Sequence, residues 1–205
     1  MTATQPEQRP ANLKDGDQPD AASRRRHRRR RALIEWGIII AVAVAAALLV
    51  KTFVLESYYI PSASMVPTLK VGNRILVDKL SYDLHGVHRG DVVVFARPPR
   101  DLGEPGVNDL VKRVVGLPGE RISSQGDQVL INGRVLREPW LPRNAALGEP
   151  IASQVIPRGN YFVMGDNRTD SLDSRSFGPI PGSLIVGRVV AKVWPPSAWR
   201  FFHFP

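Results

Sequence analysis

Three hydroxyl side chains lie within seven residues of each other in the segment YYIPSASMVPTL, at Ser62, Ser64 and Thr68. A serine hydroxyl becomes a nucleophile when a nearby base takes its proton. No histidine lies in or beside this segment. The segment is therefore either a linker or the site of a nucleophile whose base comes from elsewhere in the chain.

The four histidines, His27, His85, His88 and His203, offer weak candidates for that base. No G-x-S-x-G motif marks a nucleophile elbow. His85 and His88 could begin a metal site, but a surface turn is the favoured interpretation because no third ligand lies nearby. The chain has no cysteine, which excludes disulfides, thiolate zinc sites and cysteine nucleophiles.

A basic candidate is Lys112, in NDLVKRVVGLPG. Strand alternation sends Val111 and Arg113 to one face and Lys112 and Val114 to the other. If Arg113 faces water, Lys112 points at the core or at the edge of a cleft. Burial would lower its pKa from about 10.4 by as much as ~3–5 units, so that a neutral amine could accept a serine proton. Most strand lysines are surface residues, and spacing alone leaves that alternative open.

The segment GDNRTDSLDSRSFG gathers three carboxylates, Asp166, Asp170 and Asp173. Their spacing does not match a helical calcium loop, and no closing glutamate follows. Arg168 and Arg175 place positive charge where a cation would bind. A turn held by salt bridges is the favoured interpretation, and we expect no metal and no cofactor.

The elements that would position these residues are mainly strands. Short Val/Ile-rich segments separated by Gly, Pro, Asn and Asp predict strands and turns, without sustained helical periodicity: RILVDKL, DVVVFAR, LVKRVVG, QVLING, YFVMGD and LIVGRVVAKVW. Residues 119–160 are more polar and are predicted to be a β insertion peripheral to the chemistry. Within them, the Asn-Gly of INGRV predicts a tight hairpin.

The N-terminal residues are basic. Residues 1–31 hold nine Lys/Arg against four acids, a net +5 that leaves +4 of the formal +9 for the other 174 residues. A basic run can bind phosphate backbones, which keeps a nucleic-acid binder as one reading. We predict that residues 1–31 form a disordered tail, because few apolar side chains are present to bury.

Residues 32–50, ALIEWGIIIAVAVAAALLV, are 19 residues with a single charge, Glu35. As a helix they would extend about 28 Å, close to the ~30 Å hydrocarbon core of a bilayer. We predict a transmembrane helix over residues 32–52, with the arginine-rich side held in the cytoplasm. A cleavable secretory signal and a twin-arginine signal are the alternatives.

Four ordered blocks resemble bacterial type I signal peptidases, the membrane-bound Ser-Lys proteases that remove signal peptides from exported proteins. The blocks are IPSASMVPTL, RGDVVVF, VKRVVGLPGE and MGDNRTDSLDSRSFG, at residues 60–69, 89–95, 111–120 and 164–178. The resemblance implies a signal-peptidase-like, LexA-like, mainly β fold for an extracytoplasmic peptidase domain at residues 53–205. The protein would be a single-pass protein of the cell membrane, with lipid and signal peptides as its partners and no nucleic acid.

The same resemblance implies roles for individual residues. Ser64 is the expected nucleophile, Lys112 the general base and Ser62 the side-chain donor to the oxyanion. Ser171 is expected to hydrogen-bond and orient the lysine amine, with Asp173 and Arg175 as a supporting ion pair. The implied substrates are signal peptides with Ala-x-Ala before the cut, and the positions matching the family's cleft are Tyr58, Ile60, Pro61, Met65, Leu69 and Val111.

Two rivals and one open feature accompany this resemblance. A Ser-Lys autoproteolytic repressor would need a DNA-binding domain where this chain has its apolar segment. The other rival is non-enzymatic, a membrane-tethered β binding module or a catalytically dead relative, and neither would need Ser64 and Lys112 together. The tail VWPPSAWRFFHFP brings Trp194, Trp199 and three phenylalanines, which could rest at a membrane interface or pack onto the β domain.

Overall fold

The computed structural model describes residues 21–101 and 106–202 of the 205-residue chain. It divides into two compact units, residues 1–47 and 48–205. Helix α1 (Ala21–Phe53) begins inside the tail predicted to be disordered, so residues 21–31 are helical. Arginine has a high helix propensity, which is consistent with this outcome. The remainder of the predicted tail lies outside the described residues.

The described part of α1 presents large apolar side chains to its surroundings, among them Leu33, Ile34, Trp36, Ile38, Ile39, Ile40, Val42, Val44 and Leu48. Within residues 21–101 and 106–202, however, no helix meets the combined length and apolarity required to cross a membrane. The transmembrane helix at residues 32–52 therefore stays a prediction.

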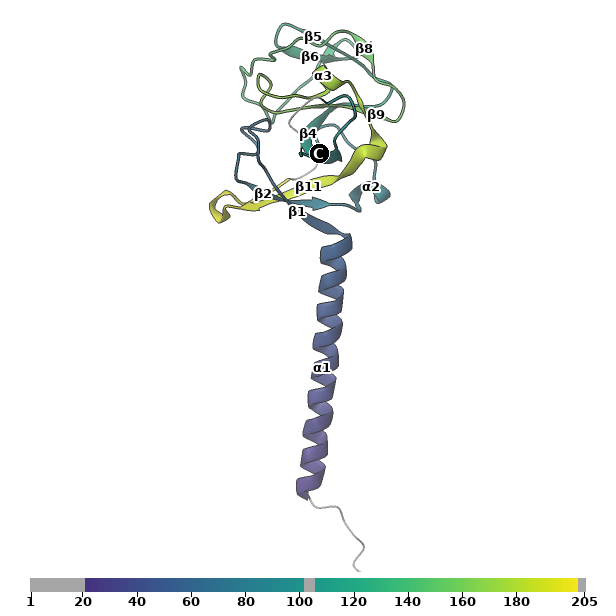
Figure 1. The fold of residues 1–205 in the computed structure, drawn as a ribbon, viewed down its shortest axis with the longest axis vertical. Coiled ribbons are helices and arrows are strands. Elements are labelled where there is room, and N and C mark those ends of the chain that lie inside the picture. Colours follow the sequence, from purple (N-terminus) through teal and green to yellow (C-terminus); the bar gives the residue numbers. More distant parts are fainter. Residues whose placement is uncertain (1–20, 102–105, 203–205) are drawn as a thin grey trace, which may run out of the picture. The chain divides into compact units, whose positions relative to one another are not determined.

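The β unit confirms the prediction of a mainly β fold (Figure 1). All pairings of its larger sheet are antiparallel, and β12 (Arg200–Phe201) adds to β11. In spatial order the other strands are β1 (Leu55–Tyr59), β2 (Arg74–Asp78), β11 (Ile185–Trp194), β3 (Val92–Ala96), β4 (Asp109–Gly116), β9 (Asn160–Met164) and β10 (Ile180–Pro181).

A second antiparallel sheet is built from residues within the predicted insertion 119–160. Its spatial order is β7 (Arg134–Val135), β6 (Gln128–Ile131), β5 (Arg121–Gln125) and β8 (Gln154–Val155). The predicted Asn-Gly hairpin joins β6 to β7, with φ of 51° at Asn132 and 78° at Gly133. Two consecutive positive φ angles match a type I′ turn, which suits the twist of paired strands.

Short helices connect these strands: α2 (Ser81–Leu84), α3 (Ser174–Phe177), and the 3-10 turns η1 (Gly182–Leu184) and η2 (Pro196–Ala198). At the start of α3, the Asp173 carboxylate accepts a hydrogen bond from the backbone N–H of Arg175. This is the ordinary role of an N-capping aspartate. The cap fixes the end of the loop that joins β9 to α3.

Strand β3 is buried on both faces, which explains its unbroken run VVVF. Val92 and Val94 join one core cluster with Ile75 and Val189, whereas Val93 and Phe95 join another. An antiparallel strand with one wet face would alternate apolar and polar residues instead. Because β4 pairs with β3, its central residues are also enclosed, and Lys112 lies among them.

Candidate active site

The loop between β1 and β2 carries the predicted nucleophile. The two ends of this loop are joined by backbone hydrogen bonds from Ile60 N to Asn73 O and from Gly72 N to Ile60 O. Ile60, Met65 and Leu69 are 3%, 1% and 0% exposed and plug the core between β1, β2 and β11. These apolar anchors hold the loop down, while the intervening Ser62 stays exposed and Ser64 is half-buried.

Lys112 is buried in β4, as expected, but not for the expected reason. Its exposed fraction is 4%, and that of Arg113 is 5%. The premise that Arg113 faces water is therefore wrong. Arg113 forms an ion pair with Asp166, with 2.6 Å between Nη2 and Oδ2, and both faces of the strand are covered.

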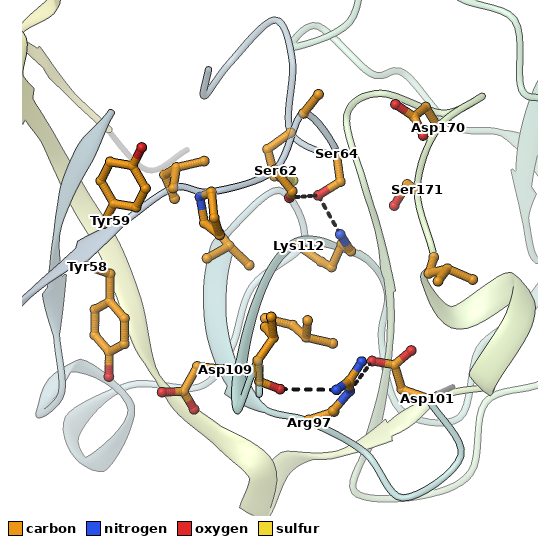
Figure 2. Close-up of a pocket in the computed structure, with 18 residues that line it drawn as sticks. Tyr58, Tyr59, Ser62, Ser64, Arg97, Asp101, Asp109, Lys112, Asp170 and Ser171 are labelled. Carbon is orange, nitrogen blue, oxygen red and sulfur yellow. Dashed lines mark hydrogen bonds and ion pairs between the residues drawn. The ribbon is translucent and has the colours of Figure 1, made fainter. Parts of the chain in front are cut away.

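The lysine reaches the serine of the neighbouring loop. Lys112 Nζ donates a hydrogen bond to Ser64 Oγ at 2.6 Å (Figure 2). Burial lowers the pKa of Lys112 from 10.5 to about 8, because the buried ammonium loses its hydration. The carboxylates of Asp173 and Asp101 oppose this shift and keep the pKa from falling further. With this pKa the ammonium predominates at pH 7, but a minor neutral fraction, far larger than that of an ordinary lysine, is present.

Ser62 lies beside the same hydroxyl, with its Oγ 3.3 Å from Ser64 Oγ. Among the described residues, the backbone N–H of Ser64 donates no hydrogen bond. The backbone carbonyl of Ser64 is held by Asn167 N at 3.0 Å. A fixed backbone with an unused N–H next to a hydroxyl can act as a pair of donors to an oxyanion.

Ser171 lines the same cleft but does not form the hydrogen bond predicted for it. Its Oγ is buried and has no hydrogen-bond partner among the residues that the structure describes. A Cβ added at Gly165 would lie 2.3 Å from Ser171 Oγ and 2.5 Å from Ser64 O. Only glycine at position 165 therefore lets Ser64 and Ser171 lie this close to the backbone there. Ser171 is thus adjacent to the dyad with an unused hydroxyl.

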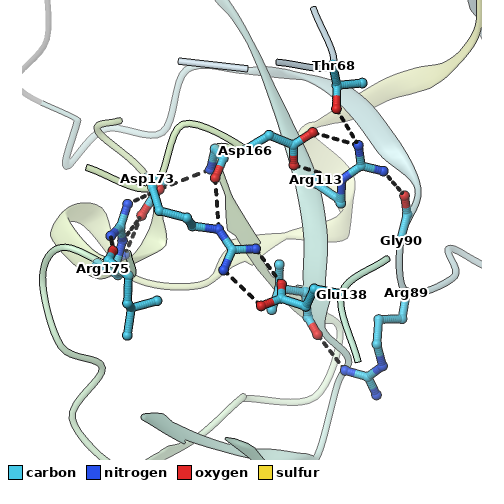
Figure 3. Close-up of polar contacts among 12 residues, drawn as sticks. Thr68, Arg89, Gly90, Arg113, Glu138, Asp166, Asp173 and Arg175 are labelled. Carbon is cyan, nitrogen blue, oxygen red and sulfur yellow. Dashed lines mark hydrogen bonds and ion pairs between the residues drawn. The ribbon is translucent and has the colours of Figure 1, made fainter. Parts of the chain in front are cut away.

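Asp173 and Arg175 form the ion pair expected from the sequence (Figure 3). Arg175 donates from Nε to Oδ1 at 2.8 Å and from Nη2 to Oδ2 at 2.7 Å. Asp173 is fully buried and also accepts from Gly165 N at 3.0 Å. Such a bidentate pair, with further hydrogen bonds, fixes the loop that carries Ser171.

An open cleft of about 510 Å³ contains the dyad. Five of the six predicted cleft residues line it: Tyr58, Ile60, Pro61, Met65 and Val111. Leu69 does not, because it is fully buried in the core beneath the loop. The remaining wall was not predicted and comes from Tyr59, Ala63, Arg97, Asp101, Val107, Asp109, Leu110, Asp170 and Leu172.

Comparison with known proteins identifies the family. The protein-family model described as signal peptidase, peptidase S26, matches residues 33–194 of this chain. The chain is similar to signal peptidase I of Leptolyngbya laminosa, with 42% identity over 76% of this chain and 77% of the relative. It is also similar to signal peptidase IB of Staphylococcus aureus strain MRSA252, with 38% identity over 84% of this chain and 95% of the relative. The chain belongs to the signal peptidase family.

A solved structure is also similar to this signal peptidase family member. It is the crystal structure of a signal peptidase I from Enterococcus faecalis V583, 30% identical, with a TM-score of 0.42. The match covers 51% of this chain and 97% of that chain.

Arg113 and Asp166 are the support residues that the sequence did not reveal in this member of the signal peptidase family. Arg113 Nη1 also donates to Gly90 O at 2.7 Å, and its guanidinium lies 4.8 Å from the ring centre of Trp140. The useful signal was present: an arginine next to Lys112, inside an apolar strand, needs a buried carboxylate partner. Asp166, in the other charged block, was available to provide it.

The acidic segment carries the salt bridges that the sequence favoured over a calcium loop. Asp166 pairs with Arg113, Asp173 pairs with Arg175, and Arg168 pairs with Glu138. Across residues 21–101 and 106–202, no three His, Cys, Asp or Glu side chains gather in a way that could hold a metal ion. His85, from the other candidate, places Nδ1 3.2 Å from the carbonyl of Ser81.

Some C-terminal aromatic residues of this family member are exposed, as contact with a membrane would require, and one packs onto the β domain. Trp194, Trp199 and Phe201 are 52%, 66% and 70% exposed, whereas Phe202 packs against the core cluster of Ile75. The indole N–H of Trp199 donates to Val193 O at 2.6 Å. Phe204 lies outside the described residues, and membrane contact of the exposed aromatics stays a prediction.

Proposed function

We propose that this protein is a type I signal peptidase, a serine endopeptidase that removes signal peptides from exported preproteins. Ser64 is the nucleophile and Lys112 is the general base. The observation that carries the proposal is the 2.6 Å contact between Lys112 Nζ and Ser64 Oγ, made by a lysine only 4% exposed. A buried amine next to a serine is the arrangement that Ser-Lys catalysis requires.

The acylation step follows from these contacts. Neutral Lys112 accepts the Ser64 proton as Oγ attacks the carbonyl carbon of the scissile bond. The oxyanion then accepts hydrogen bonds from the Ser64 N–H and the Ser62 hydroxyl. The C–N bond breaks as the Lys112 ammonium transfers its proton to the leaving amine, which departs with the mature protein.

Deacylation uses the same groups in the opposite direction. Neutral Lys112 takes a proton from water, and the resulting hydroxide attacks the acyl-ester carbonyl. The ester bond breaks, the proton returns to Ser64 Oγ, and the signal peptide leaves with a new carboxyl group. Ser171, whose buried hydroxyl has no partner among the described residues, is proposed to bind and orient the Lys112 amine when substrate is bound, and the Asp173–Arg175 pair holds the loop in place.

Specificity for Ala-x-Ala is proposed from the shape of the cleft wall. Ile60 and Met65 line the cleft but are only 3% and 1% exposed, and we propose that they form a shallow apolar floor. A shallow apolar floor accepts a methyl side chain and excludes large ones, because these would remain in contact with water or clash. Small residues at the first and third positions before the cut match this wall.

The substrate assay tests this function. A preprotein with alanine at both positions should be cut once by the wild type in detergent, at the bond after Ala-x-Ala. Phenylalanine at either position should reduce kcat/KM by at least ~100-fold, since the floor cannot accept it. Mass spectrometry of the products identifies the bond. The Ser64→Ala variant should give no product, and any cleavage that it retains would contradict the proposal.

We also place the protein in the cell membrane, with residues 32–52 as a single span, the N-terminus cytoplasmic and residues 53–205 extracytoplasmic. The support is the nearly uncharged segment of residues 32–50 behind the basic run RRRHRRRR. The exposed apolar side chains of α1, such as Ile39 and Val42, add to it, because large apolar surface is costly in water.

The membrane location gives a separate expected result. The wild type should stay in the membrane pellet after an alkaline carbonate wash. A chain with both Ile39→Arg and Val42→Arg should be released, since each arginine at a helix centre costs roughly 2.5–3.5 kcal/mol of insertion free energy. A matched chain with Ile39→Leu and Val42→Leu should stay in the pellet. Release of the wild type would refute the span.

A further inference from the structure

The long connection between β7 and β8 contacts the site from behind. We call residues 138–148 the bracing segment, and residues 165–173, between β9 and α3, the acidic loop. The bracing segment lies within the insertion that the sequence predicted to be peripheral. It nevertheless meets three buried arginines, Arg113, Arg168 and Arg175, close to the dyad.

The first of these contacts is an ion pair between Glu138 and Arg168 (Figure 3). Arg168 Nη1 donates to Glu138 Oε2 at 3.0 Å, and Nη2 donates to Oε1. The Arg168 side chain is 3% exposed and the Glu138 side chain is 12% exposed. The remaining guanidinium donor, Arg168 Nε, binds the carbonyl of Gly165 at 3.0 Å. Glu138 therefore orients Arg168, which hydrogen-bonds the backbone of Gly165 at the start of the acidic loop.

Two further contacts reinforce the same connection. The Trp140 ring stacks on the Arg113 guanidinium at 4.8 Å, and Arg113 in turn holds Asp166. Arg175 Nη1 donates to the carbonyl of Leu147 at 2.6 Å. The bracing segment is itself tied to the second sheet, because Leu147 N donates to Asp127 Oδ1 at 3.0 Å.

The acidic loop passes this support to the nucleophile. Asn167 donates from its backbone N–H to Ser64 O at 3.0 Å and from Nδ2 to Ala63 O at 3.2 Å. Gly165 packs so closely on the Ser64 carbonyl that an added Cβ would lie 2.5 Å from it. Direct contacts thus run from Glu138 to Arg168 and from Arg168 to Gly165, which packs on the Ser64 carbonyl. Asn167, next to Arg168 in the chain, binds the same carbonyl.

We propose that Glu138 is a positioning residue that sets the distance between Ser64 and Lys112 through Arg168 and the acidic loop. Glu138 does not line the cleft and does not touch the dyad. Its removal leaves the Arg168 guanidinium buried without its carboxylate, so Arg168 must move or admit water, and Gly165 moves with it. A misplacement of about 1 Å at reacting atoms can cost ~100-fold in rate. This inference rests on the function proposed above.

The test compares Glu138→Ala, Glu138→Gln and the matched control Glu149→Gln, an exposed glutamate just beyond the bracing segment. Preprotein cleavage and the rate of Ser64 acylation by a β-lactam-type inhibitor are measured in the full-length protein, well below each variant's thermal midpoint. Glu138→Ala should lower kcat and the acylation rate about 10- to 100-fold, with KM changed less than about 2-fold. Glu138→Gln keeps one accepting oxygen of the two that bind Arg168, so its rates should fall between those of Glu138→Ala and the wild type. Glu149→Gln should equal the wild type.

A purely structural role for Glu138 would lower the thermal midpoint and leave the kcat of the folded protein unchanged. That result overturns the inference, as does a Glu138→Gln variant with full activity if Glu138→Ala fails to fold. A wild type that cuts no preprotein would instead reject the proposed function. Wild-type cleavage with equal cleavage by Glu138→Ala rejects only the positioning role.

Discussion

Replacing Lys112 with alanine should abolish preprotein cleavage, lowering kcat by at least about 10⁴-fold. Lys112 Nζ is the basic group hydrogen-bonded to Ser64 Oγ, and within the described part of the chain no histidine lines the cleft. Without the lysine, the Ser64 proton has no acceptor as Oγ attacks, and the leaving amine has no donor. Single-turnover cleavage at saturating enzyme measures the loss directly.

A matched variant separates loss of the base from loss of the side chain's volume. Lys112→Arg keeps a positive charge of similar length, but a guanidinium stays protonated in proteins. We expect Lys112→Arg to remain folded and to be as inactive as Lys112→Ala. Activity within ten-fold of the wild type in either variant would show that another group acts as the base.

The wild-type pH profile gives a second check on Lys112. With a pKa of about 8, roughly one molecule in ten holds the neutral amine at pH 7. The value of kcat/KM should therefore rise with pH and level off above about 8. Because the pKa of Lys112 in the folded protein lies below 10.5, burial of its ammonium lowers the free energy of unfolding by its full amount below pH 8. The free energy of unfolding should then rise between about pH 8 and 10.5.

The Val/Ile-rich segments contain or overlap six of the twelve described strands, β2, β3, β4, β6, β9 and β11. The segments RILVDKL, DVVVFAR and LVKRVVG contain β2, β3 and most of β4, and the Asn132–Gly133 turn forms where it was predicted. Strand β1 was missed because its residues, LESYY, continue from an apolar segment without a turn signal. The bracing contacts were also missed, because they join residues about 30 positions apart that share no local pattern, as Glu138 and Arg168 do.

The site shows the same division between local and long-range information. Block order placed Ser64 and Lys112 as partners, and their side chains lie 2.6 Å apart although 48 positions separate them in the chain. Strand alternation gave the right burial for Lys112 from a wrong premise about Arg113, since alternation cannot show that both faces of β4 are covered. Leu69 was assigned to the cleft by motif position, but whether an apolar residue faces a cleft or the core depends on packing.

The second large effect is expected at Ser62. The Ser62→Ala change should lower kcat about 100- to 1000-fold and leave KM within about 3-fold, since an oxyanion donor acts on the transition state. The Ser62 hydroxyl lies 3.3 Å from Ser64 Oγ, on the exposed rim of the loop, so its removal leaves no cavity. Steady-state cleavage of an Ala-x-Ala preprotein measures both constants, and the thermal midpoint should equal that of the wild type.

The exposed Ser183, in η1, provides the control for this change. Ser183→Ala also removes one surface hydroxyl, but it has no contact with the dyad, so its kcat should equal that of the wild type. Ser62→Thr is the informative partner, because it keeps a hydroxyl on a bulkier side chain. It should recover part of the lost rate if the hydroxyl donates to the oxyanion. If the Ser62→Ala enzyme had the kcat of the wild type, the Ser62 hydroxyl would not be a donor to the oxyanion. Of the two proposed donors, the Ser64 N–H alone would then remain.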